Sequence, residues 1–471
     1  MEIHGHASSC YGGLARDHKR KESFGNMNSS EYRALQEAFV ANWNGTSLFE
    51  VSNVVSSAPA GLMLYRFVAR SKTPHPTWLA VLIDHLFIVL PLLLTMTVGS
   101  DWTLLINLSL LLLSFCASCL SYSEWPASLP PLPTRRPFIT AYRASINIAT
   151  AVAILAVDFP IFPRRFAKTE TYGTSVMDVG VGAFIVSNAI VARKESLGKA
   201  IRGSAPLILL GLARLFTIKA TDYQEHVTEY GVHWNFFFTL AVVKILSSVL
   251  ISHLGSRRLG LIGLCIGCAY QLCLSFTGLR ERLLSDSQRT GLLDANREGI
   301  ASCFGYLALY MLAVELGRFL SVARSRFRDW VICLFVLISI DVFLYGILAL
   351  LTSYVEPVSR RMANLSYVIW QLGYNVYLLV VFLLVDVACL LFASRNTSAN
   401  VLGNGSLIES ISQNQLAYFL LANLLTGCVN LCMYTVTAPT LLSFTVVFLY
   451  MLTLTVLISA LYVYNIRTKV W

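Results

Sequence analysis

Four clusters of polar side chains stand between long apolar stretches of the chain, and the first combines residue types that could perform acid–base chemistry. It runs from Asp158 to Ser175 and contains the carboxylates Asp158 and Glu170, two arginines and Lys168. A carboxylate can act as a general base when its surroundings bring its pKa toward neutrality. A nearby lysine can hold that carboxylate or stabilise an oxyanion. Arg164 and Arg165 suit a phosphate, which a guanidinium binds through paired hydrogen bonds.

The backbone of this first cluster must depart from a helix, because Pro160 and Pro163 interrupt it. Its aromatic residues Phe159, Phe162 and Phe166 keep it close to the bilayer. Irregular backbone at membrane depth is tolerated only where protein or a polar cavity covers it. We therefore expect a polar loop folded back into the protein. The alternative is an interfacial anchor, in which the basic residues contact lipid headgroups and Asp158 caps a helix.

The second cluster, residues 222–238, contains His226, Glu229, His233 and Asn235 at the start of an apolar stretch. Carboxylates and imidazoles can bind a metal, but no HExxH or two-histidine, one-carboxylate spacing is present, so we expect no metal here. A pocket for the hydroxyl groups of a sugar or polyol is a better match. A helix start within an interfacial aromatic belt is the alternative.

The third and fourth clusters precede two further apolar stretches and contribute Arg297 and Asn364 as candidate substrate-binding residues. A charge in hydrocarbon is costly and needs a partner or a cavity, although some polar side chains only join helices. Polar residues inside the apolar stretches are Asp84, His85, Arg143, Asp178, Asn188, Arg214, Lys244, Glu315, Asp341, Asp386, Asn423 and Asn430.

The composition indicates a membrane protein. Of 471 residues, 56% are hydrophobic and only 13% are charged, against about 25% charged in an ordinary soluble domain. The net charge of +10 comes largely from short loops, which is how a membrane protein sets its orientation. This distribution argues against nucleic acid as a partner. Most of the eleven cysteines lie in apolar stretches without the spacing of a zinc site.

The apolar stretches predict an all-α polytopic membrane protein with about thirteen transmembrane helices and polar loops of re-entrant type on the lumenal side. We expect a hydrophilic, lumenal tail over residues 1–45, containing an interfacial helix at 30–42, then one transmembrane domain at 46–466 and a short cytosolic tail at 467–471. The predicted spans are 48–67, 77–98, 102–122, 138–157, 174–192, 201–219, 233–252, 258–278, 299–320, 330–352, 364–392, 413–433 and 440–463.

The loops predict the orientation. One alternate set is rich in Lys and Arg and the other carries most acids, which places the N-terminus in the lumen and the C-terminus in the cytosol. The sequons at Asn28 and Asn44 are then accessible for glycosylation. Loop 393–412 agrees poorly with this scheme; we expect it to be cytosolic, with its sequons at Asn396 and Asn404 unmodified.

Long segments of the chain resemble the inositol acyltransferase family of glycosylphosphatidylinositol (GPI) anchor assembly. They are DFPIFPRRFAKTETYGTSVMDVGVG from Asp158, EHVTEYGVHWNFFFTLA from Glu225, NREGIASCFGYLALY from Asn296, NLSYVIW from Asn364 and FLLANLLTGCVNL from Phe419. The resemblance covers all of the predicted spans. Cys303, Phe304 and the long polar tail depart from the family pattern, without putting the reaction in doubt.

The resemblance implies an endoplasmic reticulum enzyme that transfers a fatty acyl group, usually palmitoyl, from acyl-CoA to the inositol ring of glucosaminyl-phosphatidylinositol. It implies Asp158 and Lys168 as the catalytic pair, held together in a dry pocket, with no bound cofactor and no metal. Membrane lipids surround the enzyme, and acyl-CoA is its co-substrate. The candidate substrate-binding residues are Arg164, Arg165, His226, Glu229, His233, Asn235, Arg297, Asn364 and Asn423. The rival interpretations are a secondary transporter of a lipid or polar solute and a membrane scaffold.

Overall fold

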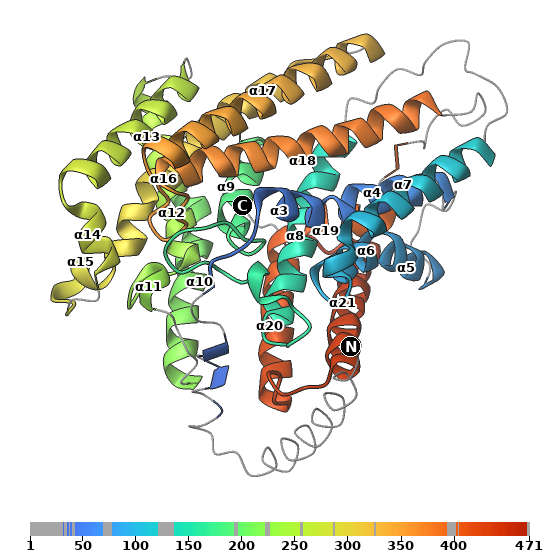
Figure 1. The fold of residues 1–471 in the computed structure, drawn as a ribbon, viewed down its shortest axis with the longest axis horizontal. Coiled ribbons are helices and arrows are strands. Elements are labelled where there is room, and N and C mark those ends of the chain that lie inside the picture. Colours follow the sequence, from blue (N-terminus) through green and yellow to red (C-terminus); the bar gives the residue numbers. More distant parts are fainter. Residues whose placement is uncertain are drawn as a thin grey trace, which may run out of the picture.

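Helices make up most of the described part of the chain (Figure 1). The computed structural model describes residues 32, 35, 36, 38, 39, 43–68, 78–120, 136–192, 196–221, 227–254, 258–285, 288–324, 326–392, 402, 403 and 405–468. Within these residues the one departure from helices and loops is an isolated bridge between Gly45 and Thr174. The all-α, polytopic architecture predicted from the sequence is thus confirmed.

Ten helical segments of the described residues are long and apolar enough to cross a membrane. They agree with ten of the predicted spans, whereas the number thirteen is not confirmed. The segments are α5–η2–α6 (Trp78–Met96, with a π-helical turn at His85–Val89), η3–α7 (Ser100–Leu120), α8 (Pro137–Ala156), α12 (Phe236–Leu254), α13 (Leu259–Phe276), α16 (Arg297–Ser321), α17 (Phe327–Tyr354), α18 (Leu365–Leu391), α20 (Gln415–Cys432) and α21 (Thr440–Val463).

The other three predicted spans take different forms. Predicted span 48–67 divides at Ser56 into α3 (Leu48–Val55) and α4 (Ser57–Val68). Predicted span 174–192 is the short helix α9 (Val179–Ala189), because the residues before it belong to the irregular first cluster. Predicted span 201–219 is α10 (Leu197–Thr221), which contains Pro206 and several basic residues.

The C-terminal part of loop 393–412 contains a helix that the sequence pattern does not indicate. Residues Gly405–Gln413 form helix α19, whose buried apolar side pairs with α8 and α21. Asp84 accepts hydrogen bonds from the Ser406 hydroxyl at 2.7 Å and the Leu407 amide at 2.8 Å. A carboxylate from a distant helix thereby satisfies amide groups at the start of α19 that have no partner within the helix. Other short helices are α11 (Val227–Tyr230), α14 (Leu279–Leu284) and α15 (Gly291–Ala295).

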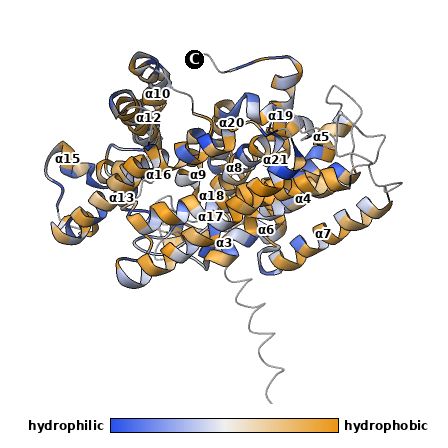
Figure 2. Ribbon diagram, turned by 90° about the horizontal axis from the view of Figure 1, so that it is seen from above, coloured by the Kyte–Doolittle hydropathy of each residue, from blue (hydrophilic) through white to orange (hydrophobic). Residues whose placement is uncertain are grey.

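Helices α8, α16 and α18 form the centre of the bundle. In their most apolar windows 72%, 72% and 67% of residues are buried, against 22% in α7 and 17% in α20. Helix α18 packs along α17, and α13 packs along α16. Apolar colour covers outer helices such as α7 and α17 (Figure 2). Lipid can solvate these outer apolar surfaces, so the polar residues of the central helices must find partners inside the protein.

The described part of the predicted interfacial helix at 30–42 is helical and contacts the rest of the protein. The Tyr32 hydroxyl lies 3.3 Å from the Thr435 hydroxyl, and its ring meets Tyr434 edge-on at 4.6 Å. The Phe39 ring lies under the Arg164 guanidinium, 3.9 Å from ring centre to Cζ. The stretch therefore packs against the first polar cluster. Asn28, His226, Asn396 and Asn404 lie outside the described residues.

Candidate active site

The loop that follows α8 folds back into the protein. Phe159, Phe162 and Phe166 are fully buried. The Arg164 guanidinium donates hydrogen bonds of 2.8 to 3.0 Å to the carbonyl oxygens of Val157, Phe159 and Phe162. These carbonyls follow the end of α8 and lack helical partners. Arg164 thus fixes the loop that carries Asp158. The N–H groups of its guanidinium are bonded to backbone carbonyl oxygens of the protein.

Asp158 lies at the end of α8, and its carboxylate faces α20. Its Oδ2 accepts a hydrogen bond of 2.8 Å from Nδ2 of Asn430. Burial raises the pKa of Asp158 to about 6, against the opposing effects of this hydrogen bond and of the Arg164 charge. Such a carboxylate is mostly ionised at neutral pH and yet binds a proton far more readily than an exposed aspartate. These are the properties of a general base.

Lys168 lies ten residues further along and forms an ion pair with Glu229 of α11. Its Nζ donates to both carboxylate oxygens, at 2.7 and 2.9 Å. The Lys168 side chain keeps 41% of its surface exposed, while that of Glu229 keeps 16%. Burial acts to raise the pKa of Glu229, but the charges of Lys168 and Arg360 outweigh it and lower the pKa to about 2. Glu229 therefore remains ionised and holds the lysine near the protein surface.

Arg360 connects this ion pair to a second carboxylate. Its Nη1 lies 3.2 Å from Oε1 of Glu229, and its Nε lies 2.8 Å from Oδ1 of Asp178. Asp178 is fully buried and also accepts a 2.8 Å hydrogen bond from the hydroxyl of Thr169, the residue after Lys168. The network therefore returns to the segment from which it started, and it fixes that segment at two adjacent residues.

The expected direct pairing of Asp158 with Lys168 is not found. Both residues are described, and neither a hydrogen bond nor an ion pair joins them. The ammonium group has a closer carboxylate in Glu229, and the Asp158 carboxylate is turned toward Asn430. The two side chains belong to separate polar networks on the same loop.

Arg361, the neighbour of Arg360, contacts a different segment. Its Nη2 lies 3.2 Å from Oε1 of Glu298 and 2.8 Å from the carbonyl oxygen of Leu283. Arg289 donates two hydrogen bonds of 2.8 Å to the same fully buried carboxylate. Arg297, a predicted substrate-binding residue, is buried and lies 3.6 Å from the same carboxylate. The consecutive arginines Arg360 and Arg361 thus connect three segments that are remote in sequence.

Several other predicted substrate-binding residues have their polar atoms engaged by the protein. Arg165 pairs with Glu50 at 2.8 Å and with Asp101 at 2.6 Å. Asn235 is buried and donates to the Gly211 carbonyl at 3.0 Å while it accepts from the Phe237 amide near the start of α12. Asn364 caps α18 by accepting from the Tyr367 amide at 3.0 Å. These contacts position helices.

Two predicted residues keep side chains that could meet a substrate. The backbone amide of His233 donates a hydrogen bond of 2.8 Å to Oδ1 of Asn296, and the His233 residue is partly exposed. Asn423 is exposed on α20 and donates to the Phe419 carbonyl one turn earlier. His226 lies outside the described residues. Among the described residues, three or more His, Cys, Asp or Glu side chains nowhere gather as they would around a metal ion.

Comparison with known proteins decides the family. Residues 32–461 match the family described as GWT1. The chain belongs to the GWT1 family. A Bos taurus member named glucosaminyl-phosphatidylinositol-acyltransferase PIGW is 36% identical, with 93% of this chain and 99% of the relative aligned. The GPI-anchored wall transfer protein 1 of Aspergillus fumigatus is 34% identical over the same shares. An uncharacterized protein of Arabidopsis thaliana is 41% identical, covering 83% of this chain and 89% of its own length.

Three residues of this GWT1-family site were not among the predicted site residues: Asn430, Asp178 and Arg360. Asn430 and Asp178 are polar residues within apolar stretches, and Arg360 stands four residues before Asn364 in the fourth cluster. The signal was present, but the sequence does not show which polar residue meets which. Arg360 and Asp178 are 182 positions apart.

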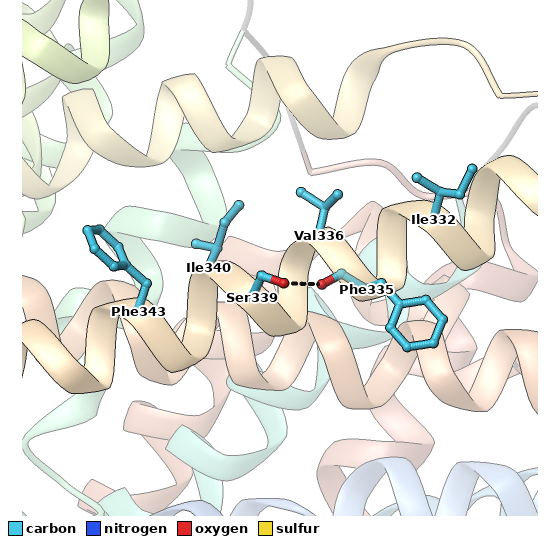
Figure 3. A pocket seen from close by; sticks show the side chains of 6 residues that line it. All are labelled: Ile332, Phe335, Val336, Ser339, Ile340 and Phe343. Carbon is cyan, nitrogen blue, oxygen red and sulfur yellow. Dashed lines mark hydrogen bonds between the residues drawn. The ribbon is translucent and has the colours of Figure 1, made fainter.

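A shallow apolar depression of about 440 Å³ on α17 lies apart from this chemistry (Figure 3). All of its lining residues belong to one helix, and its one polar group, the Ser339 hydroxyl, donates to the Phe335 carbonyl at 2.9 Å. In a GWT1-family protein such a surface suits lipid. The lining residues are Ile332, Phe335, Val336, Ser339, Ile340 and Phe343.

Proposed function

We propose that this protein transfers a fatty acyl group, palmitoyl, from acyl-CoA to the inositol ring of glucosaminyl-phosphatidylinositol during GPI-anchor biosynthesis. The names of two relatives that align over nearly their whole length support the lipid substrate and the acyl transfer. The observation that supports the chemistry is the environment of Asp158. Burial raises the pKa of its carboxyl group to about 6.

In the proposed reaction Asp158 accepts the proton of the inositol hydroxyl, whose oxygen attacks the thioester carbonyl. A new carbon–oxygen bond forms, the carbon–sulfur bond breaks, and the CoA thiolate leaves with the proton that Asp158 releases. Asn430 keeps the carboxylate oriented toward α20 by its 2.8 Å hydrogen bond. No covalent acyl-enzyme is needed, and no metal or bound cofactor enters the reaction.

Lys168 is proposed to stabilise the negative charge that develops on the thioester oxygen. Its side chain is exposed enough to meet a substrate. Glu229, fixed by Arg360, restrains the ammonium group. The inositol phospholipid would then bind between the Asp158 network and the Lys168 network. The predicted substrate-binding residues His233, which is partly exposed, and Asn423, which is exposed, remain candidates for contacts to its headgroup.

The proposal places the protein in the endoplasmic reticulum membrane with a lumenal N-terminus and a cytosolic C-terminus. The described spans support a multi-pass protein. The predicted cytosolic loops are rich in Lys and Arg, which supports the orientation.

Microsomes that contain this protein, supplied with labelled palmitoyl-CoA and glucosaminyl-phosphatidylinositol, test the proposal. A palmitoylated lipid whose amount rises with the amount of protein is expected, and Asp158→Ala should abolish it while the protein stays in the membrane. Movement of a lipid or solute across sealed vesicles without acylation would instead support the transporter.

A further inference from the structure

Four arginines gather where the end of α16 meets the starts of α8 and α17, and together they are called the arginine patch. The turn between α16 and α17 and the first helical turn of α17 contain three of them: Arg324, Arg326 and Arg328. The fourth, Arg136, precedes the first residue of α8, and its Nη2 donates to the carbonyl oxygen of Ser321 at 2.6 Å. Residues remote in sequence thus meet at one end of three helices.

Two guanidinium groups of the arginine patch share a carbonyl oxygen at the end of α16. Nη2 of Arg136 and Nη1 of Arg324 both lie 3.3 Å from the oxygen of Val322. Nη2 of Arg324 also donates to the Phe319 carbonyl at 3.0 Å. Burial and the nearby Arg324 charge lower the pKa of Arg136. The two cations are therefore held close together by backbone oxygens.

Carboxylates do not offset the charge of the arginine patch. Among the described residues, no ion pair includes any of the four arginines or Asp329, the acid next to Arg328 in sequence. Carbonyl oxygens orient guanidinium groups but do not neutralise them. Arg326 and Arg328 are exposed, so a ligand can reach them. The patch therefore presents uncompensated positive charge to an anion.

The apolar depression on α17 begins one helical turn after Arg328 (Figure 3). Its lining residues follow Arg328 at helical spacings of three and four, which places them on the same side of the helix. The eleven steps from Ile332 to Phe343 rise about 16 Å. One leaflet provides half of a hydrocarbon core of about 30 Å. The depression therefore has the length of one leaflet, with arginines at its headgroup end.

We propose that the arginine patch and the depression together bind one anionic glycerophospholipid, in the leaflet that the loop charges place on the cytosolic side. The headgroup phosphate contacts Arg326 and Arg328, since a planar guanidinium binds phosphate through paired hydrogen bonds. One acyl chain lies along the depression. A cluster of basic residues immediately beside a transmembrane helix is the pattern that recognises anionic lipid. A soluble anion would use the charges but not the adjoining apolar surface. This inference does not depend on the proposed acyl transfer.

Native mass spectrometry of the purified, delipidated protein can compare dioleoyl-phosphatidylserine with dioleoyl-phosphatidylcholine. Phosphatidylserine is the anionic probe, because it has no inositol ring with which to occupy the proposed acceptor site. We expect one phosphatidylserine molecule to bind more tightly than phosphatidylcholine. Arg326→Gln/Arg328→Gln should weaken phosphatidylserine binding about twenty- to thirtyfold, which is roughly fivefold for each arginine near a lipid headgroup. Phosphatidylcholine binding should not change.

Two further variants separate the apolar half of the site from general attraction to positive charge. Ser339→Trp fills the depression without changing any charge, so it should weaken the binding of both lipids. Arg318→Gln is the matched control, because it removes a nearby arginine of α16 that Glu315 already pairs at 3.1 Å. This control should bind both lipids as wild type does.

Equal affinity of the wild type for the two lipids would overturn the inference, as would phosphatidylserine binding that survives Arg326→Gln/Arg328→Gln. An equal loss in Arg318→Gln would reduce the patch to general charge attraction. Displacement of phosphatidylserine by palmitoyl-CoA but not by other lipids would assign the patch to the acyl donor instead. If the double variant does not fold, Arg326→Gln and Arg328→Gln decide singly, and wild-type affinity in both contradicts the proposal.

Discussion

At Asp158, burial and hydrogen bonding act on one carboxylate in opposite directions. Burial raises the pKa, while the Asn430 amide and the Arg164 charge limit the rise to about 6. Neutral pH lies just above this value, so most molecules carry the ionised base. The resemblance of the first cluster predicted Asp158, but its hydrogen bond to Asn430 depends on helix packing that no local pattern reveals.

The first prediction concerns the pH dependence of kcat/KM. Protonation of Asp158 removes the base, so the rate should fall as the pH decreases through about 6. Asn430→Ala removes a hydrogen bond that favours the ionised form, so this fall should begin at a higher pH. Cys432→Ala, on the same helix and exposed, should keep the wild-type profile. An unchanged profile in Asn430→Ala would show that Asp158 does not control the rate.

The second prediction concerns Lys168. Lys168→Ala should reduce kcat by a factor of about a hundred or more, since electrostatic stabilisation of an oxyanion commonly contributes that much. Protein abundance in the membrane should stay the same, because the lysine is 41% exposed and Glu229 keeps Arg360 as a partner. Lys199→Ala, an exposed lysine on α10, serves as the control. A wild-type rate in Lys168→Ala would remove the lysine from the mechanism.

At the scale of elements, the consecutive arginines between α17 and α18 tie the polar loops together. Arg360 contacts the segment after α8 and helix α11, and Arg361 contacts the first turn of α16. Sequence patterns located most helices, because an apolar stretch of about 20 residues records a span directly. They missed α19, which is short and is capped by Asp84 of another helix, and they did not give the partners of Arg360.

The third prediction tests this connection. Arg360→Met leaves Asp178 and Glu229 without a shared cation in a buried setting, which should lower the free energy of unfolding by about 3–5 kcal/mol. Arg318→Met removes a partly exposed ion pair and should change it by less than about 1 kcal/mol. Thermal unfolding of the purified proteins in detergent gives the comparison. Equal stability of the two variants would mean that the network does not hold the loops.

At the scale of the whole molecule, loop charges and bundle geometry lead to one arrangement. The central helices α8, α16 and α18 bring polar networks together, and less buried helices such as α7, α17 and α20 surround them. The composition and the apolar stretches predicted a polytopic membrane protein. They did not show the forms that the predicted spans 48–67 and 174–192 take, because apolar content does not reveal a break at Ser56 or the short length of α9.

The fourth prediction concerns orientation. With a lumenal N-terminus, Asn28 and Asn44 should be glycosylated, and Asn44 is exposed in the structure. Endoglycosidase treatment should then increase gel mobility, and the double variant Asn28→Gln/Asn44→Gln should lose this shift. Asn396→Gln and Asn404→Gln should have no effect. A shift that depends on Asn396 or Asn404 would reverse the orientation.

The most direct measurement of the central claim is single-turnover transfer of palmitoyl to glucosaminyl-phosphatidylinositol by purified wild type, Asp158→Asn and Asp341→Asn. Asp341 provides the matched control, because it is another carboxylate within the helix bundle whose Oδ1 has no hydrogen-bond partner in the structure. Asparagine keeps the size of the side chain but cannot accept the hydroxyl proton. We predict that Asp158→Asn forms no acylated lipid above background while Asp341→Asn matches wild type. Acylation by Asp158→Asn at the wild-type rate would contradict the account.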